Sequence, residues 1–229
     1  MAKLLIVGGT GFFGKSILEY LSNSKLRKKF ELIYILSKKK KINKENTNNL
    51  VIESINKNLL DIKKLPNVKY IIYLAKLKNS IQDIKAAKNF VKILNKKDLK
   101  EKTHFLYVSS GAIYGQTSKK KLINENYLLK EKRKKFLNSQ KEDYSYAKIK
   151  CENIFLNCNV ANIDVRIARC FTFTGEHLID NKFAIVEFIK SILNKKKITL
   201  KSNYNVYRSY MHAKEMSRWL INILLKNNI

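Results

Sequence analysis

A glycine-rich junction at residues 8–14 constrains the fold of this chain more than any other feature. The segment GGTGFFG directly follows an apolar run, Lys3 to Val7, and opens a segment with helical spacing of apolar residues, Phe13 to Leu21. Glycines at such a strand–helix junction allow a tight turn and a close approach of the backbone to a ligand, and the helix N-terminus presents N–H groups to an anion. The junction therefore predicts a site for the pyrophosphate of a dinucleotide, with a tight turn that holds no ligand as the alternative. The residues expected to bind the dinucleotide here are Gly8, Gly11, Phe12, Phe13 and Gly14.

Apolar runs and helical segments alternate along the first three quarters of the chain. The strands also lack the alternation of apolar and polar residues expected of a sheet with one solvent-exposed face. Together these patterns predict an α/β fold with a doubly wound parallel sheet covered by helices on both sides. Residues 116–143 are rich in Lys and Asn and predict a surface excursion, and after residue 176 the pattern dissolves. We therefore expect a dinucleotide-binding domain over residues 1–175 and a small substrate lobe over residues 176–229. The predicted strands are Lys3–Val7, Glu31–Leu36, Tyr70–Ala75, His104–Ser109 and Asp164–Phe171, and the helices between them are Phe13–Leu21, Ile81–Leu94, Tyr144–Asn157 and Phe183–Leu193.

Charge and composition exclude several classes of protein. The formal net charge of +29 favours contact with polyanions, but the excess is almost all Lys and is spread along the chain. Nucleic-acid sites favour Arg for bidentate contacts, so we expect no specific nucleic-acid partner. No apolar run is long enough to span a bilayer, and residues 1–7 leave no room for a signal peptide, so we expect no membrane partner. Three cysteines without C-x-x-C spacing and three scattered histidines predict no disulfide framework and no metal site, and hence a cytoplasmic protein.

The residues after the second strand bear on the choice of coenzyme. An acid at this position accepts a hydrogen bond from the ribose 2′-OH and favours NAD. This chain instead has Ser37 followed by lysines from Lys38 to Lys41. A hydroxyl followed by cations suits a 2′-phosphate, so the sequence favours NADP over NAD, with a solvated lysine loop as the alternative.

Three side chains form the candidate catalytic group. Tyr144 and Lys148 are four residues apart, which places both on one face of a helix. A tyrosine with an ordinary pKa of about 10 needs a nearby cation to exchange a proton near neutral pH, and Lys148 supplies one. Ser110 follows a predicted strand at its carboxyl end, where open parallel sheets bind ligands, and we expect it to orient the reacting oxygen. Ser109 is the second candidate for that role, and ordinary turn hydrogen bonding is the alternative for both serines.

Taken together, the motifs resemble those of the sugar-nucleotide epimerase/dehydratase family, the extended branch of the short-chain dehydrogenases. The segments that carry the resemblance are GGTGFFG, KNLLDIKKL at 57–65, YIIYLAK at 70–76, VSSGAIYG at 108–115, YSYAK at 144–148, RCFTFTGE at 169–176 and RSYMHAKE at 208–215. The resemblance implies that NAD(P) lies across the strand ends. It implies catalytic roles for Ser110, Tyr144 and Lys148, a further cofactor contact from Lys148, and substrate contacts from Ser110 and Tyr144. It also implies cofactor contacts from Asn58, Leu59, Ala75 and Phe171, and substrate contacts from Thr172 and Arg208, the latter with a diphosphate.

Two departures from the family pattern narrow the expected activity. Dehydratases of the family carry an Asp-Glu pair where this chain has Gly111 and Ala112, so we set dehydration aside. The chain also ends soon after RSYMHAKE, which predicts an incomplete C-terminal substrate lobe. The leading expectation is an NADPH-dependent reductase of a keto-sugar carried on a nucleotide diphosphate. The alternatives are an NAD-dependent 4-epimerase and a nucleotide-binding module without turnover. The family analogy also suggests a homodimer packed through the helices at 81–94 and 144–157.

Overall fold

The central element of the computed structural model is a six-stranded, fully parallel sheet with strand order β3-β2-β1-β4-β5-β6. The structure describes residues 1–38, 49–97, 99, 101–115, 123–127, 140–179, 183–200 and 208–226. The order reverses between β1 and β4, so that the crevice at the strand ends opens beside these two strands. The strands are β1 (Ala2–Val7), β2 (Phe30–Ser37), β3 (Ile52–Asn56), β4 (Tyr70–Tyr73), β5 (Thr103–Ser110) and β6 (Ile163–Cys170).

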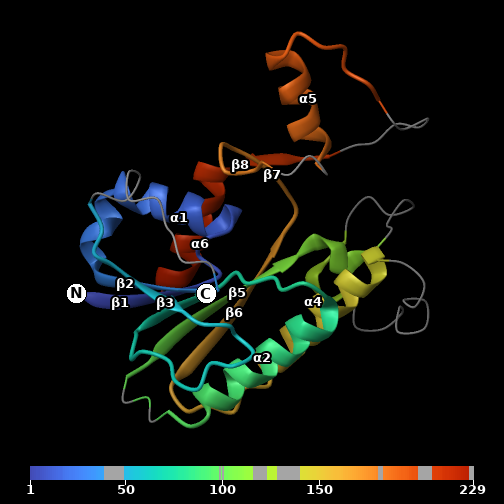
Figure 1. Ribbon diagram of the computed structural model, residues 1–229. Coiled ribbons are helices and arrows are strands. Elements are labelled where there is room, and N and C mark those ends of the chain that lie inside the picture. The colour runs from blue at the N-terminus through green and yellow to red at the C-terminus, as the bar shows by residue number, and fades with distance from the viewer. Residues whose placement is uncertain are drawn as a thin grey trace.

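Two helical layers cover the sheet because the strands present apolar side chains on both faces. In β1, Leu4 and Ile6 belong to the core under α1 (Phe12–Ser22) and α6 (Ala213–Leu225). Leu5 and Val7 of the same strand belong to the core under α2 (Ser80–Leu94) and α4 (Gln140–Leu156). Figure 1 shows the two pairs of helices on opposite sides of the sheet. The predicted doubly wound α/β fold is therefore confirmed, since parallel strands with helices on both faces have alternate side chains in two separate cores.

The C-terminal segment combines a second small sheet with a helix that stands apart. Strands β7 (Thr172–Thr174) and β8 (Tyr210–His212) pair in parallel, and α5 (Ala184–Leu193) lies away from the main sheet in Figure 1. Large apolar side chains of α5, including Ile192 and Leu193, are exposed. Short 3₁₀ helices complete the described elements at Lys25–Lys29, Gly111–Tyr114 and Glu125–Tyr127.

The sequence did not predict the strand β3 or the helix α6. The edge strand β3 exposes Glu53 and Ser54 and so lacks the continuous apolar run of a buried strand. Helix α6 follows the predicted boundary at residue 175, yet its buried side chains join the core that covers one face of the sheet. The boundary itself stays a prediction. The lysine run from residue 39 onward and most of the predicted excursion at 116–143 lie outside the described residues.

The packing of α6 yields a stability test with two neighbouring residues. Leu220 is 2% exposed and lies in the core against the sheet, whereas Trp219 on the same helix is 59% exposed. We expect Leu220→Ala to lower the free energy of unfolding by about 2–5 kcal/mol, because it leaves a cavity in the core. Trp219→Ala is the control and is expected to change it by about 0.5 kcal/mol or less. Urea unfolding of both variants checks this, and similar values for the two would show that α6 does not belong to the core.

Candidate active site

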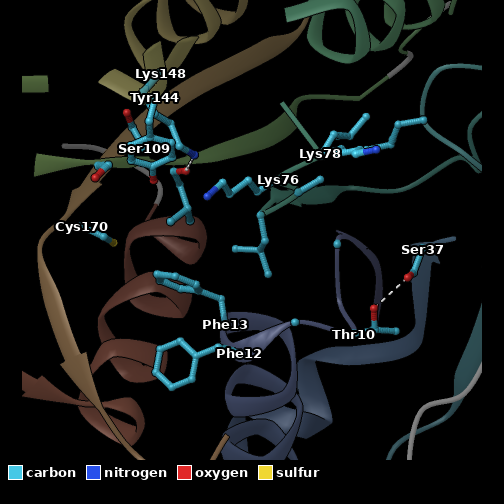
Figure 2. Close-up of a pocket in the computed structure, with 18 of the residues that line it drawn as sticks. Thr10, Phe12, Phe13, Ser37, Lys76, Lys78, Ser109, Tyr144, Lys148 and Cys170 are labelled. Carbon is cyan, nitrogen blue, oxygen red and sulfur yellow. Dashed lines mark hydrogen bonds between the residues drawn. The ribbon is translucent and has the colours of Figure 1, made fainter. Parts of the chain in front are cut away.

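A cavity of about 930 Å³ opens at the carboxyl ends of the strands. Its wall includes the glycine junction after β1, the ends of β2, β4, β5 and β6, and the first turns of α4. Figure 2 shows side chains from these elements facing one another across it. The sheet topology places such a cavity here because the strand order reverses at β1 and β4.

The four glycines of the junction have different surroundings, and a Cβ on Gly9 would lie 2.7 Å from the Ile35 side chain. Gly8 adopts φ +86°, and an added Cβ would lie 2.8 Å from the Ala75 backbone, so a side chain is excluded by conformation and by contact. A Cβ on Gly14 would lie 2.3 Å from the backbone of Gly9, so the start of α1 packs directly on the turn. A Cβ on Gly11 would meet only the Gly8 carbonyl oxygen, at 3.6 Å. Packing within the protein therefore accounts for Gly8, Gly9 and Gly14, whereas Gly11 has space above it that a ligand could approach.

The cavity wall carries hydroxyl groups next to the end of β2, and lysines are spread along it. Thr10 Oγ1 and Ser37 Oγ are 2.8 Å apart, which ties the glycine junction to the end of β2 (Figure 2). The loop that contains Asn58 and Leu59 is fastened to α2, because Asn89 Nδ2 donates to the Leu59 carbonyl oxygen at 2.9 Å. Among the described residues that line the cavity are five lysines and no carboxylate: Lys38, Lys57, Lys76, Lys78 and Lys148. Such a lining favours an anionic ligand.

Tyr144, Lys148 and Ser110 meet at the other end of the cavity. The Lys148 ammonium lies 5.8 Å from the centroid of the Tyr144 ring and donates to the Val108 carbonyl oxygen at 3.0 Å. Ser110 forms a hydrogen bond with Tyr144 and accepts one from the Ala112 N–H at 3.2 Å. The three side chains come from the carboxyl end of β5 and from α4, which packs against that strand. The structure thus brings together the predicted catalytic group within the predicted dinucleotide cavity.

Burial and neighbouring groups set the protonation of this group. Burial raises the pKa of Tyr144, the hydrogen bond from Ser110 lowers it, and the charges of Asp83 and Cys170 raise it further. Burial lowers the pKa of Lys148, which is only 7% exposed. Both shifts favour the neutral forms, so an added positive charge in the cavity is needed before Tyr144 can lose its proton near neutral pH.

The neighbouring serine, Ser109, has an unmet hydrogen-bonding capacity. Its side chain is 3% exposed and lines the cavity, and its Oγ atom has no hydrogen-bond partner among the described residues. A buried hydroxyl without a partner is costly and is ordinarily satisfied by a ligand or by water. The two serines therefore differ: Ser110 faces Tyr144, whereas Ser109 Oγ is enclosed by protein atoms and has no hydrogen-bond partner among the described residues.

Most of the predicted site residues line this one cavity. Two do not: Gly14, which lies beneath the turn, and Arg208, which is exposed just before β8. Several other residues that line the cavity were not predicted. For Lys76 and Lys78, the available signal was their position just after an apolar strand. The predicted residues in the wall are Gly8, Gly11, Phe12, Phe13, Ser37, Lys38, Asn58, Leu59, Ala75, Ser110, Tyr144, Lys148, Phe171 and Thr172, and the unpredicted polar ones are Thr10, Lys57, Lys76, Lys78, Gln82 and Cys170.

The model of one protein family, described as the NAD dependent epimerase/dehydratase family, matches residues 4–228. The chain belongs to this family. The assignment places it among enzymes of the short-chain dehydrogenase type and confirms the resemblance of the motifs. No curated protein matches the sequence significantly. Within the described residues, no group of three His, Cys, Asp or Glu side chains could hold a metal ion, and no helix has the length and apolarity to cross a membrane.

Solved structures of this epimerase/dehydratase family share the fold at low sequence identity. A dTDP-glucose 4,6-dehydratase from Bacillus anthracis, in complex with NAD, aligns with 100% of this chain and 73% of its own, at 18% identity and a TM-score of 0.79. A UDP-N-acetylglucosamine 4-epimerase from Methanobrevibacter ruminantium aligns with 99% of this chain and 74% of its own, at 20% identity and a TM-score of 0.70. A UDP-glucuronic acid 4-epimerase from Bacillus cereus, in complex with UDP-glucuronic acid and NAD, aligns with 99% and 74%, at 16% identity and a TM-score of 0.71.

The glycine junction of this family member provides a test that separates packing from ligand binding. We expect Gly14→Ala to lower the free energy of unfolding by at least about 1–3 kcal/mol, because the added Cβ overlaps the Gly9 backbone. Gly11→Ala is expected to cost at most about 1 kcal/mol, because its Cβ has space and only the helix N-cap changes. Thermal and urea unfolding measure both. Equal destabilisation by the two variants would contradict the assignment of Gly11 to a ligand.

Proposed function

We propose that this enzyme transfers hydride between a nicotinamide dinucleotide and a sugar carried on a nucleotide diphosphate, with NADPH as donor and a keto-sugar as substrate. The observation that carries the proposal is the convergence of Tyr144, Ser110 and Lys148 in the cavity that begins at the glycine junction. The glycine with space above it and the lysine-rich wall both fit a bound dinucleotide.

The side chains divide the chemistry of a carbonyl reduction among them. The nicotinamide ring supplies the hydride when bound, and its oxidised form carries a positive charge. Ser110 orients the carbonyl oxygen beside the phenol, and Tyr144 donates the proton that converts this oxygen to a hydroxyl. Lys148 stabilises the phenolate that remains and contacts the ribose of the cofactor. Thr172 lines the cavity and contacts the substrate, while its hydroxyl donates to the Ser209 carbonyl oxygen at 2.7 Å. Arg208 holds the diphosphate, for which a guanidinium offers paired donors.

The aromatic ring of Phe171 lies against Gly111, next to Ser110, and this disfavours dehydration as the activity. Gly111 stands at the first position of the acid pair, and a Cβ there would lie 2.4 Å from the Phe171 ring. That ring stacks on Tyr114, with the two centroids 6.1 Å apart. The chain therefore has an aromatic ring where a dehydratase needs a carboxyl group, and no proton shuttle for loss of water.

The removal of the Tyr144 hydroxyl tests the catalytic role directly. We expect Tyr144→Phe to lower kcat by about 10²- to 10⁴-fold and to leave the dissociation constant of the cofactor nearly unchanged, because only the proton transfer is lost. Tyr146→Phe is the matched control, since Tyr146 lies on the same helix and is exposed outside the cavity. Turnover is measured as NADPH oxidation with a panel of nucleotide-linked keto-sugars. Full activity in Tyr144→Phe would contradict the proposal.

Preference for NADP over NAD is supported by the end of β2, where Ser37 and Lys38 line the cavity. We expect Lys38→Gln to weaken NADPH binding roughly fivefold, which is the effect of an exposed ion pair, and to leave NADH binding unchanged. Lys88→Gln removes the same charge from the exposed side of α2, outside the cavity, and serves as the control. Titration of protein fluorescence with both coenzymes measures the affinities. An equal effect of Lys38→Gln on NADH and NADPH would overturn the preference.

A 4-epimerase is the second candidate, and its support comes from the structural neighbours, two of which are 4-epimerases of UDP-sugars. An epimerase removes and returns the same hydride, so it consumes no coenzyme and retains NAD. Extraction of the purified protein therefore separates the two candidates: tightly held NAD favours the epimerase, and an empty protein that oxidises free NADPH favours the reductase. Cofactor binding without turnover of any nucleotide-linked sugar would instead indicate a binding module.

We also propose that the enzyme is a homodimer through α2 and α4. Ile81 and Leu156 are exposed large apolar side chains on these two helices, which pack against each other on one face of the sheet. The two side chains lie at opposite ends of the helix pair, so the analogy with the family carries this proposal.

A further inference from the structure

A second ammonium group approaches the phenol of Tyr144. Lys76 follows β4 at the carboxyl edge of the sheet, and its Nζ atom lies 4.8 Å from the centroid of the Tyr144 ring. Lys148 is farther away, at 5.8 Å from the same centroid. Figure 2 shows the Lys76 side chain extended across the cavity toward Tyr144 and Lys148. Tyr144 and Lys148 of α4 are thus accompanied by a second cation, Lys76, from the loop after β4.

The two lysines are held differently. Lys148 is buried, donates to the Val108 carbonyl oxygen at 3.0 Å and lies 4.9 Å from the Tyr107 ring centroid. Burial lowers its pKa, and the nearby charge of Lys76 lowers it further. Lys76 is exposed within the cavity, and neither a hydrogen bond nor an ion pair joins it to any described residue. Its ammonium is therefore available to a negative charge that develops in the cavity.

The remaining groups that face Tyr144 oppose its ionisation, with one exception. Asp83 on α2 and Cys170 on β6 raise the pKa of Tyr144, and so does burial, which is the largest cause. Ser110 on β5 is the exception, since its hydrogen bond lowers that pKa. Asp83 is held in place by the Leu77 N–H, which donates to Asp83 Oδ1 at 2.6 Å. A phenolate at this position therefore needs more positive charge than Lys148 alone provides.

We propose that Lys76 is a positioning residue that stabilises the Tyr144 phenolate together with Lys148. The inference rests on the proposed function, because it concerns the proton transfer of that same site. The oxidised cofactor lowers the pKa of Tyr144 toward neutral pH, and the positive charge of Lys76 lowers it further. Lys76 thus affects the reaction only through the ionisation of the Tyr144 phenol. Because the ammonium is exposed, water and salt weaken its effect, so the contribution is smaller than that of a buried pair.

The test measures ionisation of the phenol rather than turnover. Tyrosinate absorbance is recorded against pH for the protein in complex with NADP, and the spectrum of Tyr144→Phe is subtracted to isolate Tyr144. We expect Lys76→Gln to raise the pKa of Tyr144 by roughly half a unit, and Lys76→Arg to keep it near that of the unaltered protein. Lys88→Gln is the control, since Lys88 is exposed on α2 and lies outside the cavity, and we expect no change.

The outcomes separate this inference from the function on which it rests. An unchanged Tyr144 pKa in Lys76→Gln, in a protein that binds NADP, would overturn the role of Lys76 and leave the hydride-transfer proposal standing. Equal shifts in Lys76→Gln and Lys76→Arg would overturn it too, because charge would not be the cause. Failure of the unaltered protein to bind NADP or NAD would contradict the proposed function itself and with it the role of Lys76. A shift that shrinks as salt concentration rises would support an exposed ammonium as its source.

Discussion

Two backbone contacts at the end of β1 position the glycine junction and the loop after β4, which form one side of the cavity. Gly8 turns against Ala75, which brings the loop after β4 next to the glycine junction, and Gly14 packs on Gly9, which brings the start of α1 over the end of β1. Neither contact leaves space for a Cβ atom. As a result the N-terminus of α1 faces the cavity with its free N–H groups, and Lys76 begins beside the junction and reaches Tyr144.

The wall of this cavity carries positive charge, which complements the negative phosphates of the dinucleotide expected to bind there. Its lysines come from the ends of β2, β3 and β4 and from α4, and no carboxylate is among the described residues of its wall. The same charge acts on the phenol of Tyr144, which burial alone would keep protonated. Two of these cations, Lys76 and Lys148, also lie 4.8 and 5.8 Å from the centroid of the Tyr144 ring, and we propose that they favour its ionised form.

Sequence patterns predicted most of the sheet but not its edge or its last helix. Buried parallel strands are continuous apolar runs, so five of the six strands were placed within a few residues. The edge strand β3 exposes Glu53 and Ser54 and carries no such run. Helix α6 has a readable stripe in Met216, Leu220 and Leu224, but nothing local to it indicates that its partner is the sheet built from the first part of the chain. For the site, the motifs predicted about half of the residues that line the cavity, while Lys76 and the unpaired hydroxyl of Ser109 were not predicted.

The sequence by itself determined the local relations: a glycine junction between strand and helix, and Tyr144 and Lys148 on one face of a helix. These follow from backbone geometry and from a period of 3.6 residues, which act over a few neighbouring positions. Only the tertiary structure decided that Lys76, in the loop after β4, approaches a tyrosine of α4. Such contacts depend on strand register and on how helices lie across the sheet, and those are set by packing between elements that are far apart in the chain.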